Sequence, residues 1–337
     1  MEPSKDTLLT IEELSVAFNT PDGCVQAVRG ISLQVARGKV VAIVGESGCG
    51  KSVTCQAIMG LNPPAPFTTV SGSIIFDGQE LLTRTELELE RLRGGRIGMI
   101  FQNPMTSLNP TMTIGKQVME GIFLHHRCST ADAHDQALAL LEKVGISDAQ
   151  QRFGQYPHQF SGGMRQRVMI AIALSGNPDV IIADEPTTAL DVTIQAQILE
   201  LLRSLQKETE MSVILVTHDL AVVSGFADRL VIVYAGKIVE EGDSSQLLSN
   251  PQHPYTQALI KALPQLGQDR SQPLATIDGR PPNLMDPPSG CPFWPRCPYA
   301  MRICQEQLPE VTVVDTDHNA RCWLHHPLAV HKKVSNV

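Results

Sequence analysis

The chain has 337 residues, a formal net charge of −8 and a sequence pI near 5.7, and 4 % of its residues are aromatic. This length suits one large domain with an addition, or two domains, and the acidic balance argues against a nucleic-acid partner, although a nucleotide pocket needs only local positive charge. No apolar run approaches the ~18 residues of a membrane-spanning helix, and the polar N-terminus lacks a secretory apolar segment, so we expect a protein that is cytosolic or peripheral on the cytosolic side of a membrane.

The N-terminal part of the chain predicts strands. Residues 8–18 alternate loosely between apolar and polar side chains, and residues 25–35 form a second extended stretch after the turn signal Thr20-Pro21-Asp22-Gly23. Residues 40–44 are all apolar, which is typical of a buried strand. We expect the earlier strands to pack on the sheet that contains residues 40–44.

A glycine-rich segment follows the buried strand and precedes a predicted helix. It fits the pattern G-x-x-x-x-G-K-[ST] at every fixed position and consists of Gly45, Glu46, Ser47, Gly48, Cys49, Gly50, Lys51 and Ser52. Glycines let backbone N–H groups converge on an anion, and the helix N-terminus adds partial positive charge at the same point. Lys51 can reach the β- and γ-phosphates of a nucleotide, and the Ser52 hydroxyl can bind Mg²⁺. This segment therefore predicts a nucleotide phosphate site.

Strands and helices alternate beyond this phosphate loop. The further predicted strands are residues 73–76, 97–101, 180–183, 213–217, 230–234 and 237–240, the last two forming a hairpin. Helices are predicted at residues 87–92, in a helical region at 114–178, and between the strands at 180–183 and 213–217. This alternation predicts a mostly parallel sheet with helices packed on it.

Two further motifs predict parts of an ATP site. Asp184 and Glu185 follow the strand at 180–183; on a strand beside the phosphate loop, Asp184 would hold Mg²⁺ and Glu185 would polarise an attacking water. Ser161-Gly162-Gly163 begins a predicted helix and is a second anion-binding helix N-terminus. Because one nucleotide has one γ-phosphate, this second motif indicates a phosphate bound from another subunit.

Together these motifs resemble an ABC-transporter ATPase over roughly residues 8–250. The motifs that carry the resemblance are Gly45–Ser52, Gln102, Ser161-Gly162-Gly163, Asp184-Glu185, Ala189-Leu190-Asp191 and His218. The resemblance implies the α/β fold of a P-loop NTPase, with a parallel core sheet, an antiparallel β subdomain and a helical subdomain at about 114–178.

The resemblance also implies roles for individual residues. Phe18 would stack on adenine, and Gln102 would contact Mg²⁺ and sense a membrane partner. Residues 161–163 would reach the nucleotide of the opposite subunit, and Asp191 would belong to a loop across the dimer interface. His218 would be the switch histidine on the γ-phosphate.

The signature at residues 161–163 has unusual neighbours. Phe160 stands where the family most often has leucine, and Met164 where it has glutamine. The serine and both glycines, which the family uses to contact phosphate, are intact. Because Glu185 and His218 are present as well, we expect this chain's phosphate loop to support hydrolysis.

Three stretches are similar to the ATPases of oligopeptide/dipeptide importers: residues 101–110, residues 156–160, and His253-Pro254-Tyr255-Thr256 with the tail at 290–298. This resemblance implies an ATP-hydrolysing subunit on the cytoplasmic face of the bacterial inner membrane. It would work with two membrane permeases, a second and different ATPase, and indirectly a peptide-binding protein. The same subfamily serves nickel, glutathione and certain sugars. A soluble ABC ATPase without a permease usually has two ATPase domains or a long coiled coil, and neither is found here; a kinase would not need residues 161–163.

The proline-rich segment from residue 251 to 337 forms a predicted C-terminal extension. It carries four cysteines spaced C-x₅-C-x₆-C-x₁₇-C: Cys291, Cys297, Cys304 and Cys322. Zinc sites usually show closer pairs, whereas a [4Fe–4S] cluster takes four thiolates and suits wider spacing. We therefore expect a structural [4Fe–4S] cluster, with zinc or with free or disulfide-forming thiols as the alternatives.

Overall fold

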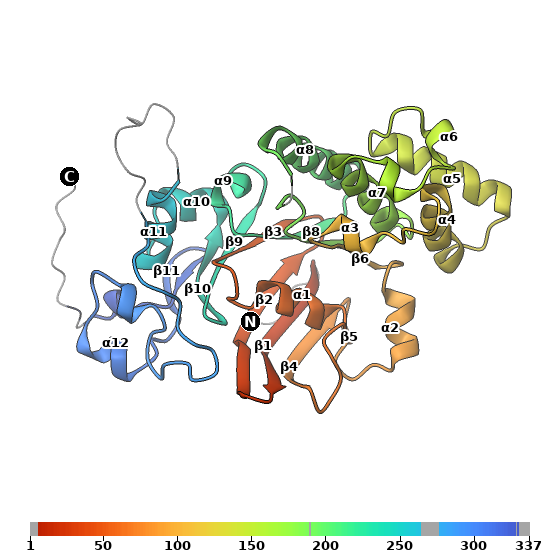
Figure 1. Ribbon diagram of the computed structural model, residues 1–337. Helices are drawn as coiled ribbons and strands as arrows, with labels where there is room; N and C mark the ends of the chain where they lie inside the picture. Colours follow the sequence, from red (N-terminus) through yellow and green to blue (C-terminus); the bar gives the residue numbers. More distant parts are fainter. Residues whose placement is uncertain (1–5, 189, 264–275, 328, 330–337) are drawn as a thin grey trace.

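The computed structural model describes residues 6–188, 190–263, 276–327 and 329. Two β-sheets face one another in it, and most of the helices cover the far side of the larger sheet (Figure 1). Ala189, part of one predicted motif, lies outside the described residues. In the described ranges no helix combines the length and the apolar character needed to cross a membrane.

The smaller sheet is antiparallel and has the strand order β2-β1-β4-β5. Its strands are β1 (Thr7–Thr20), β2 (Gly23–Ala36), β4 (Thr68–Phe76) and β5 (Gln79–Glu80). β1 and β2 form a long hairpin in which Thr20 pairs with Gly23 at the turn and Thr7 pairs with Ala36 at the other end. The predicted strands at 8–18 and 25–35 are therefore confirmed, and the antiparallel β subdomain is present.

The larger sheet has eight strands in the order β11-β12-β10-β9-β3-β8-β7-β6. They are β3 (Val40–Val44), β6 (Ile97–Ile100), β7 (Val180–Asp184), β8 (Ser212–Thr217), β9 (Arg229–Tyr234), β10 (Lys237–Asp243), β11 (Thr312–Asp315) and β12 (His318–Ala320). β9, β3, β8, β7 and β6 are parallel neighbours, and the predicted hairpin joins β9 to antiparallel β10. The turn residues Ala235 and Gly236 both have positive φ, which is the backbone of a type I′ hairpin turn.

Alternate residues of the central strand enter two separate hydrophobic cores. Val41 and Ile43 of β3 pack with the smaller sheet, whereas Ala42 and Val44 pack with the helices on the other side. Successive side chains of a strand point to opposite faces, so a strand that is buried on both faces is apolar throughout. This explains why the sequence of β3 contains no polar residue.

The helices connect the parallel strands and build the helical region. Their bounds are α1 (Lys51–Ile58), α2 (Glu86–Leu92), α3 (Pro104–Ser107), α4 (Ile114–His125), α5 (Thr130–Lys143), α6 (Ala149–Arg152), α7 (Gly162–Leu174), α8 (Val192–Thr209), α9 (Leu220–Val223), α10 (Ser244–Ser249), α11 (Pro254–Lys261) and α12 (Arg302–Glu306). Short 3₁₀ turns lie at η1 (Pro157–Gln159), η2 (Trp294–Arg296) and η3 (Trp323–His325). α4 to α7 confirm the helical region expected at about 114–178.

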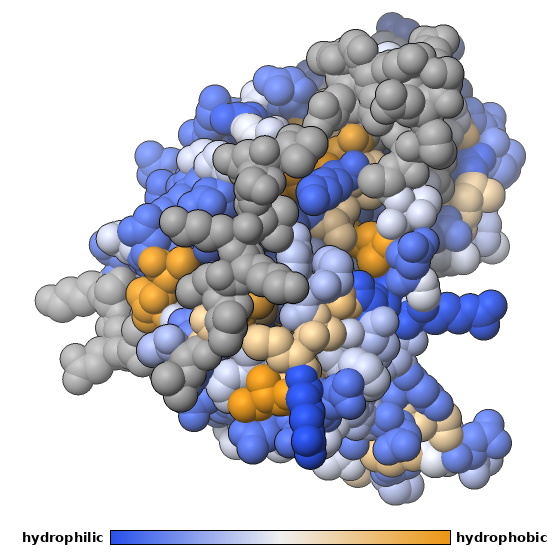
Figure 2. All heavy atoms as spheres, turned by 90° about the vertical axis from the view of Figure 1, so that its left-hand side faces the viewer, coloured by the Kyte–Doolittle hydropathy of each residue, from blue (hydrophilic) through white to orange (hydrophobic). Residues whose placement is uncertain are grey.

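The described part of the C-terminal extension packs against the larger sheet and its helices. α11 buries Tyr255, and β12 pairs with β10 through Glu240 and Ala320, so the hairpin β11–β12 lengthens the larger sheet. Figure 2 shows this side of the molecule, where hydrophilic residues alternate with small hydrophobic patches. The division between residues 250 and 251 stays a prediction, because the described part of the extension shares a core with the rest.

Candidate active site

The phosphate loop runs from the end of β3 to the start of α1, and its glycines are required by close backbone approaches. A Cβ on Gly45 would lie 2.1 Å from the Val233 carbonyl oxygen, and one on Gly50 would lie 2.3 Å from that of Ala27. Gly48 and Gly50 have φ values of +79° and +100°, where side chains are strained. The pattern of fixed glycines thus follows from packing as well as from phosphate binding.

Lys51, the first residue of α1, lies folded over this loop. Its side chain is only 4 % exposed, and its Nζ donates to the carbonyls of Gly45 at 2.8 Å and Glu46 at 3.0 Å. Nζ also lies 3.8 Å from Glu185 Oε1. The ammonium is therefore held where the loop and the end of β7 meet, which is where the motif predicts the terminal phosphates.

Side chains from four different segments contact or closely approach the Glu185 carboxylate. Oε2 accepts hydrogen bonds from Gln102 Nε2 at 3.0 Å and Thr188 Oγ1 at 2.8 Å. His218 Nδ1 lies 3.4 Å from the same oxygen, and Lys51 approaches the other oxygen. Gln102 follows β6, Glu185 follows β7 and His218 follows β8, so the carboxyl ends of three parallel strands meet here.

Asp184, the last residue of β7, accepts a hydrogen bond from Ser52 Oγ at 2.9 Å. Burial raises the pKa of this carboxyl, the neighbouring Glu185 raises it further, and the Ser52 hydroxyl and Lys51 lower it again. A buried carboxylate beside a hydroxyl is a set of hard oxygen donors and fits Mg²⁺. The chain thus places Ser52 and Asp184 together, as both motifs require.

Other predicted residues lie apart from this cluster. Ser161 begins α7, where its Oγ accepts from Met164 N at 3.4 Å, and it is exposed. Exposed Asp191 begins α8 in the same way, accepting from Ile194 N at 3.0 Å. Among the described residues, no hydrogen bond or ion pair joins Ser161, Gly162 or Gly163 to the phosphate loop. Phe18 lies in β1, half-buried against the core between the sheets.

The prediction of a [4Fe–4S] cluster on Cys291, Cys297, Cys304 and Cys322 is wrong, and so is the zinc alternative. Over the described ranges there is no group of three or more His, Cys, Asp or Glu side chains placed to hold a metal ion. The four cysteines are free thiols around a cavity of about 10 Å³ that aromatic side chains also line, with room for at most about one water. Burial raises the pKa of Cys291 to about 11 and of Cys322 to about 12.

Sequence reasoning missed three residues that contact the site. Thr188 holds Glu185, while Tyr255 and Arg296 of the extension both bond to Glu46 in the phosphate loop. Thr188 lies three residues after Glu185, and this short spacing is a signal that could have been used. Tyr255 and Arg296 lie more than 200 residues from the loop, and nothing in their local sequence indicates this contact.

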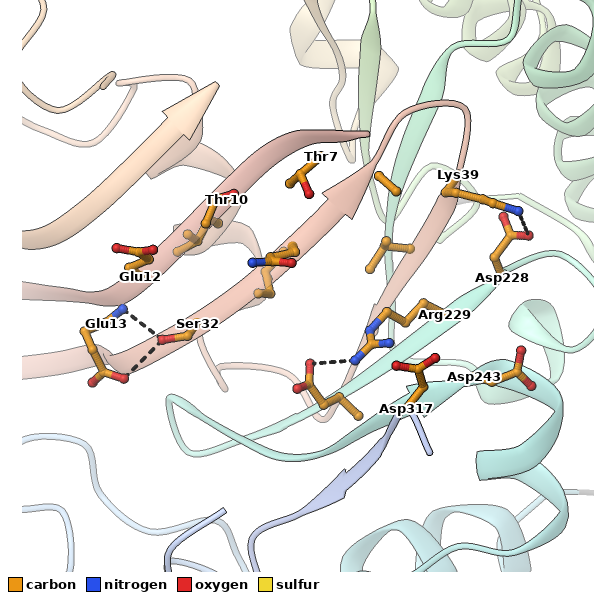
Figure 3. A pocket seen from close by; sticks show the side chains of 16 residues that line it. Thr7, Thr10, Glu12, Glu13, Ser32, Lys39, Asp228, Arg229, Asp243 and Asp317 are labelled. Atoms are coloured by element: carbon orange, nitrogen blue, oxygen red, sulfur yellow. Dashed lines mark hydrogen bonds and ion pairs between the residues drawn. The ribbon is translucent and has the colours of Figure 1, made fainter. Parts of the chain in front are cut away.

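A larger cleft of about 830 Å³ lies away from these motifs, between β1, β2 and the starts of β3 and β9 (Figure 3). Six carboxylate residues line it: Glu12, Glu13, Asp228, Glu241, Asp243 and Asp317. Two of them pair with cations inside the cleft, Asp228 with Lys39 and Glu241 with Arg229. A cleft so rich in carboxylates is unsuited to a triphosphate, so the candidate active site is assigned to the loop and the Glu185 cluster.

Two family models match this chain. One is described as ABC transporter and matches residues 28–188. The other is described as the C-terminal region of oligopeptide/dipeptide transporters and matches residues 239–304. The first covers the phosphate loop, Glu185 and the residues between them, and the second covers α11 and three of the four clustered cysteines.

Curated relatives align along nearly the whole chain. A dipeptide transport ATP-binding protein of Bacillus subtilis is 49 % identical over 98 % of this chain and 98 % of its own length. An oligopeptide transport ATP-binding protein of Escherichia coli is 48 % identical over 90 % of this chain and 89 % of its own. These descriptions name transport and ATP binding.

Solved structures show the same fold. The dimeric ATP-binding cassette MJ0796, in a post-hydrolysis state with ADP and Pi, matches with a TM-score of 0.63 and 29 % identity. The match covers 70 % of this chain and 99 % of that one. The protein cbiO1 of Clostridium perfringens, part of the ABC transporter complex cbiONQ, gives a TM-score of 0.62 over 73 % of this chain and 92 % of its own. The α/β fold predicted for an ABC ATPase is thereby confirmed.

Proposed function

This chain belongs to the family of ABC transporter ATP-binding subunits, and from that membership we propose that it energises the import of di- or oligopeptides through two membrane permeases. The chain is an ATPase of this family. The peptide assignment is supported by the C-terminal region at 239–304 and by relatives described as dipeptide and oligopeptide transport proteins. A nickel or glutathione importer of the same subfamily is the alternative.

The observation that carries the proposal is the convergence on Glu185. Its carboxylate holds Gln102 at 3.0 Å and lies 3.4 Å from His218 and 3.8 Å from Lys51. In the proposed mechanism, Lys51 leaves the loop carbonyls to bind the β- and γ-phosphates, and Glu185 orients the attacking water. Catalysis is then mainly positioning and neutralisation of charge on the γ-phosphate.

Mg²⁺ held by Ser52, Gln102 and Asp184 would neutralise charge on the phosphate oxygens. His218 would donate a hydrogen bond to the γ-phosphate, and its half-exposed side chain beside Glu185 supports this role. Because Gln102 contacts Glu185 directly, a shift of the loop that carries Gln102 would change the geometry of the water-orienting carboxylate. This contact supports a sensing role for Gln102.

A second ATPase subunit is supported by the separation of the two phosphate motifs. The signature at residues 161–163 is exposed and makes no bond to the phosphate loop within the described chain. Val192, beside Asp191, has 81 % of its surface exposed, so its side chain can contact a partner subunit. We propose that the partner's signature covers this chain's nucleotide and that the partner is a different ATPase. No nucleic acid takes part.

The permeases would dock beside Gln102. Phe101 and Met105 flank Gln102 and are exposed, and Phe123 and Leu124 of α4 are also exposed. A groove of about 340 Å³ on α4 is lined by both apolar and charged side chains. Such a group of exposed apolar side chains suits the binding of a short cytoplasmic helix of a membrane partner in this groove. The proposed location is accordingly the cytoplasmic face of the bacterial inner membrane.

Reconstitution tests the proposal. The chain is co-expressed with the permeases and the second ATPase encoded beside it, placed in liposomes with the external peptide-binding protein, and assayed for ATP-dependent uptake of labelled di- and oligopeptides, nickel and glutathione. We expect peptide uptake that Lys51→Ala abolishes. Uptake of nickel or glutathione alone would assign the alternative. Recovery of the chain on ribosomes, and not on membranes when the permeases are present, would overturn the importer function.

A further inference from the structure

Two residues of the C-terminal extension hold Glu46, the second residue of the phosphate loop. The Tyr255 hydroxyl accepts a hydrogen bond from Glu46 N at 3.0 Å. Arg296 Nη1 donates to Glu46 Oε2 at 2.9 Å. The extension thus fixes both the backbone and the side chain of one loop residue. No other part of the described chain bonds to the Glu46 side chain.

Arg296 is built into the protein and does not form a loose surface ion pair. Its side chain is 5 % exposed. It also donates to the carbonyls of Ile277 at 3.0 Å and Asp278 at 2.9 Å and to the Tyr234 hydroxyl at 3.1 Å. Burial alone would lower the pKa of Arg296, but its bonds to Glu46 and Tyr234 raise it, so the guanidinium stays charged.

Three buried rings hold this guanidinium and the Tyr255 hydroxyl in place. The ring of Tyr234, from β9, lies 4.6 Å from that of Tyr255 and 5.4 Å from that of Phe293, and the last two rings are 5.3 Å apart. The guanidinium lies over Tyr234 and Phe293 at 5.8 Å and 5.9 Å. Such packing restricts rotamers, so the contacts to Glu46 are made from a rigid support.

Two physical effects follow for a bound triphosphate. A loop already fixed in one conformation loses less conformational entropy on binding. The Glu46 carboxylate would repel a polyanion in the adjacent loop, and Arg296 neutralises it at short range. Both effects act on binding, because in the described chain Arg296 and Tyr255 bond to Glu46 and to neither Glu185 nor His218.

We propose that the C-terminal extension sets the ATP affinity of the phosphate loop, with Arg296 and Tyr255 as positioning residues that act through Glu46. This inference rests on the proposed role of the loop as the ATP site. It assigns to the extension a part in nucleotide binding, although its residues are remote in sequence from every nucleotide motif.

The first test compares two arginines of the same extension. Arg296→Met removes the charge and keeps the length of the side chain, and Arg302→Met is the matched control because Arg302 is 90 % exposed and pairs only with Glu306. Binding of a fluorescent ATP analogue with Mg²⁺ is measured on the full chain, below the unfolding temperature of each variant. We expect Arg296→Met to raise the Kd for the analogue about tenfold. Without Arg296, Glu46 must be ordered when the nucleotide binds, and the entropy cost of ordering one residue corresponds to about this factor. Arg302→Met should leave Kd unchanged.

Coupling with Glu46 separates positioning from general damage. Glu46→Gln alone should weaken binding less than Arg296→Met does, because it weakens the contact but also removes the carboxylate that repels the triphosphate. Arg296→Met with Glu46→Gln should bind no more weakly than Arg296→Met, because both changes act on one contact. Arg296→Lys should recover part of the affinity. Tyr255→Phe, which removes only the hydroxyl, should raise Kd about threefold, whereas Tyr299→Phe on the same extension should not.

In the assembled transporter, Arg296→Met should raise KM for ATP and leave kcat within about twofold, because the loss lies in binding. An unchanged Kd and KM together with a lowered unfolding temperature would show a purely structural role and overturn the inference. Additive effects of Arg296→Met and Glu46→Gln would overturn it as well. Failure of the wild-type chain to bind ATP would instead refute the function assigned to the loop.

Discussion

Glu185 combines a strained backbone with a central place among charged side chains. Its φ is +45°, a conformation that non-glycine residues seldom adopt, and it is largely buried. Such strain persists where surrounding contacts hold a residue in place, and it is often found at functional sites. Here the hydrogen bonds from Gln102 and Thr188 hold the carboxylate beside Lys51 and His218.

Glu185→Gln should stop turnover and spare ATP binding. The amide is nearly isosteric and can keep a contact with Thr188, but it cannot accept a proton from an attacking water. We expect kcat of the assembled ATPase to fall at least about 100-fold, the usual contribution of a general base, while Kd for ATP changes little. Steady-state phosphate release and nucleotide binding measure the two effects.

Glu142→Gln is the matched control, because Glu142 is an exposed glutamate of α5. It should leave both constants unchanged. Turnover at the wild-type rate in the Glu185→Gln enzyme would remove Glu185 from its proposed role.

The sequence allowed prediction of those site residues that belong to a local sequence pattern. Lys51, Glu185 and His218 each follow a strand or a glycine turn, and the structure brings them together. Arg296 could not be predicted, because its partner Glu46 lies 250 residues away and the resemblance of residues 290–298 to importer ATPases implies no contact with the phosphate loop. The clustered cysteines misled for the opposite reason. Four cysteines in one segment, at a spacing that suits a [4Fe–4S] cluster, indicated a metal site, whereas the thiols are packed among apolar side chains.

Among the elements, the hairpin β11–β12 was not predicted. Its strands are short, β11 has no buried side chain, and the buried residues of β12 are His318 and Ala320, so the hydrophobic pattern is weak. What holds the hairpin is a fully buried polar pair, in which His318 Nε2 lies 2.8 Å from Glu240 Oε1 of β10. By contrast, β7 and β8 are buried along their whole length and were predicted from apolar runs alone.

His318→Ala should destabilise the protein strongly. It leaves the Glu240 carboxylate buried with only the backbone N–H groups of Gln252 and His253 as partners. Removing one member of a buried polar pair costs about 3 kcal/mol of unfolding free energy. Urea denaturation followed by circular dichroism measures the loss.

His134→Ala is the control, because His134 is half exposed and pairs with the exposed Asp135. It should change the unfolding free energy by less than about 0.5 kcal/mol. Equal losses in the two variants would show that the buried pair does not hold the hairpin.

His253, the N-cap residue of α11, should make the stability of the protein sensitive to acid. Burial lowers the pKa of His253 from 6.5 to about 3 in the folded chain, and the nearby His325 adds to this. Below pH 6.5 the unfolded chain therefore binds a proton that the folded chain does not, and stability is lost as pH falls toward about 3. This group alone should cost about 2 kcal/mol between neutral pH and pH 5.

His253→Asn isolates that contribution. Asparagine can still accept from Tyr255 N, as His253 Nδ1 does at 3.1 Å, but it does not titrate. The unfolding free energy of this variant, measured by urea denaturation, should vary less between pH 7 and pH 5 than that of the wild type. Parallel curves for the two proteins would show that His253 is protonated in the folded state.

Across the whole molecule, the nucleotide motifs lie on two separate surfaces. The phosphate loop and the Glu185 cluster lie at the carboxyl ends of the parallel strands, whereas Ser161 begins α7 in the helical region (Figure 1). This separation supports the proposal that a second subunit completes the ATP sites. The sequence predicted this division through a second anion-binding motif at residues 161–163, because one nucleotide has only one γ-phosphate.

A signature variant should therefore disable the partner's site and not its own. Ser161→Arg places a large cation at the start of α7, where the partner's γ-phosphate would bind. In the assembled transporter, vanadate trapping of a photoreactive ATP analogue should label this chain as in the wild type and the second ATPase much less. The exposed Ser147→Arg should change neither label. Loss of label from this chain alone would mean that Ser161 serves its own phosphate loop, and the composite ATP site would have to be abandoned.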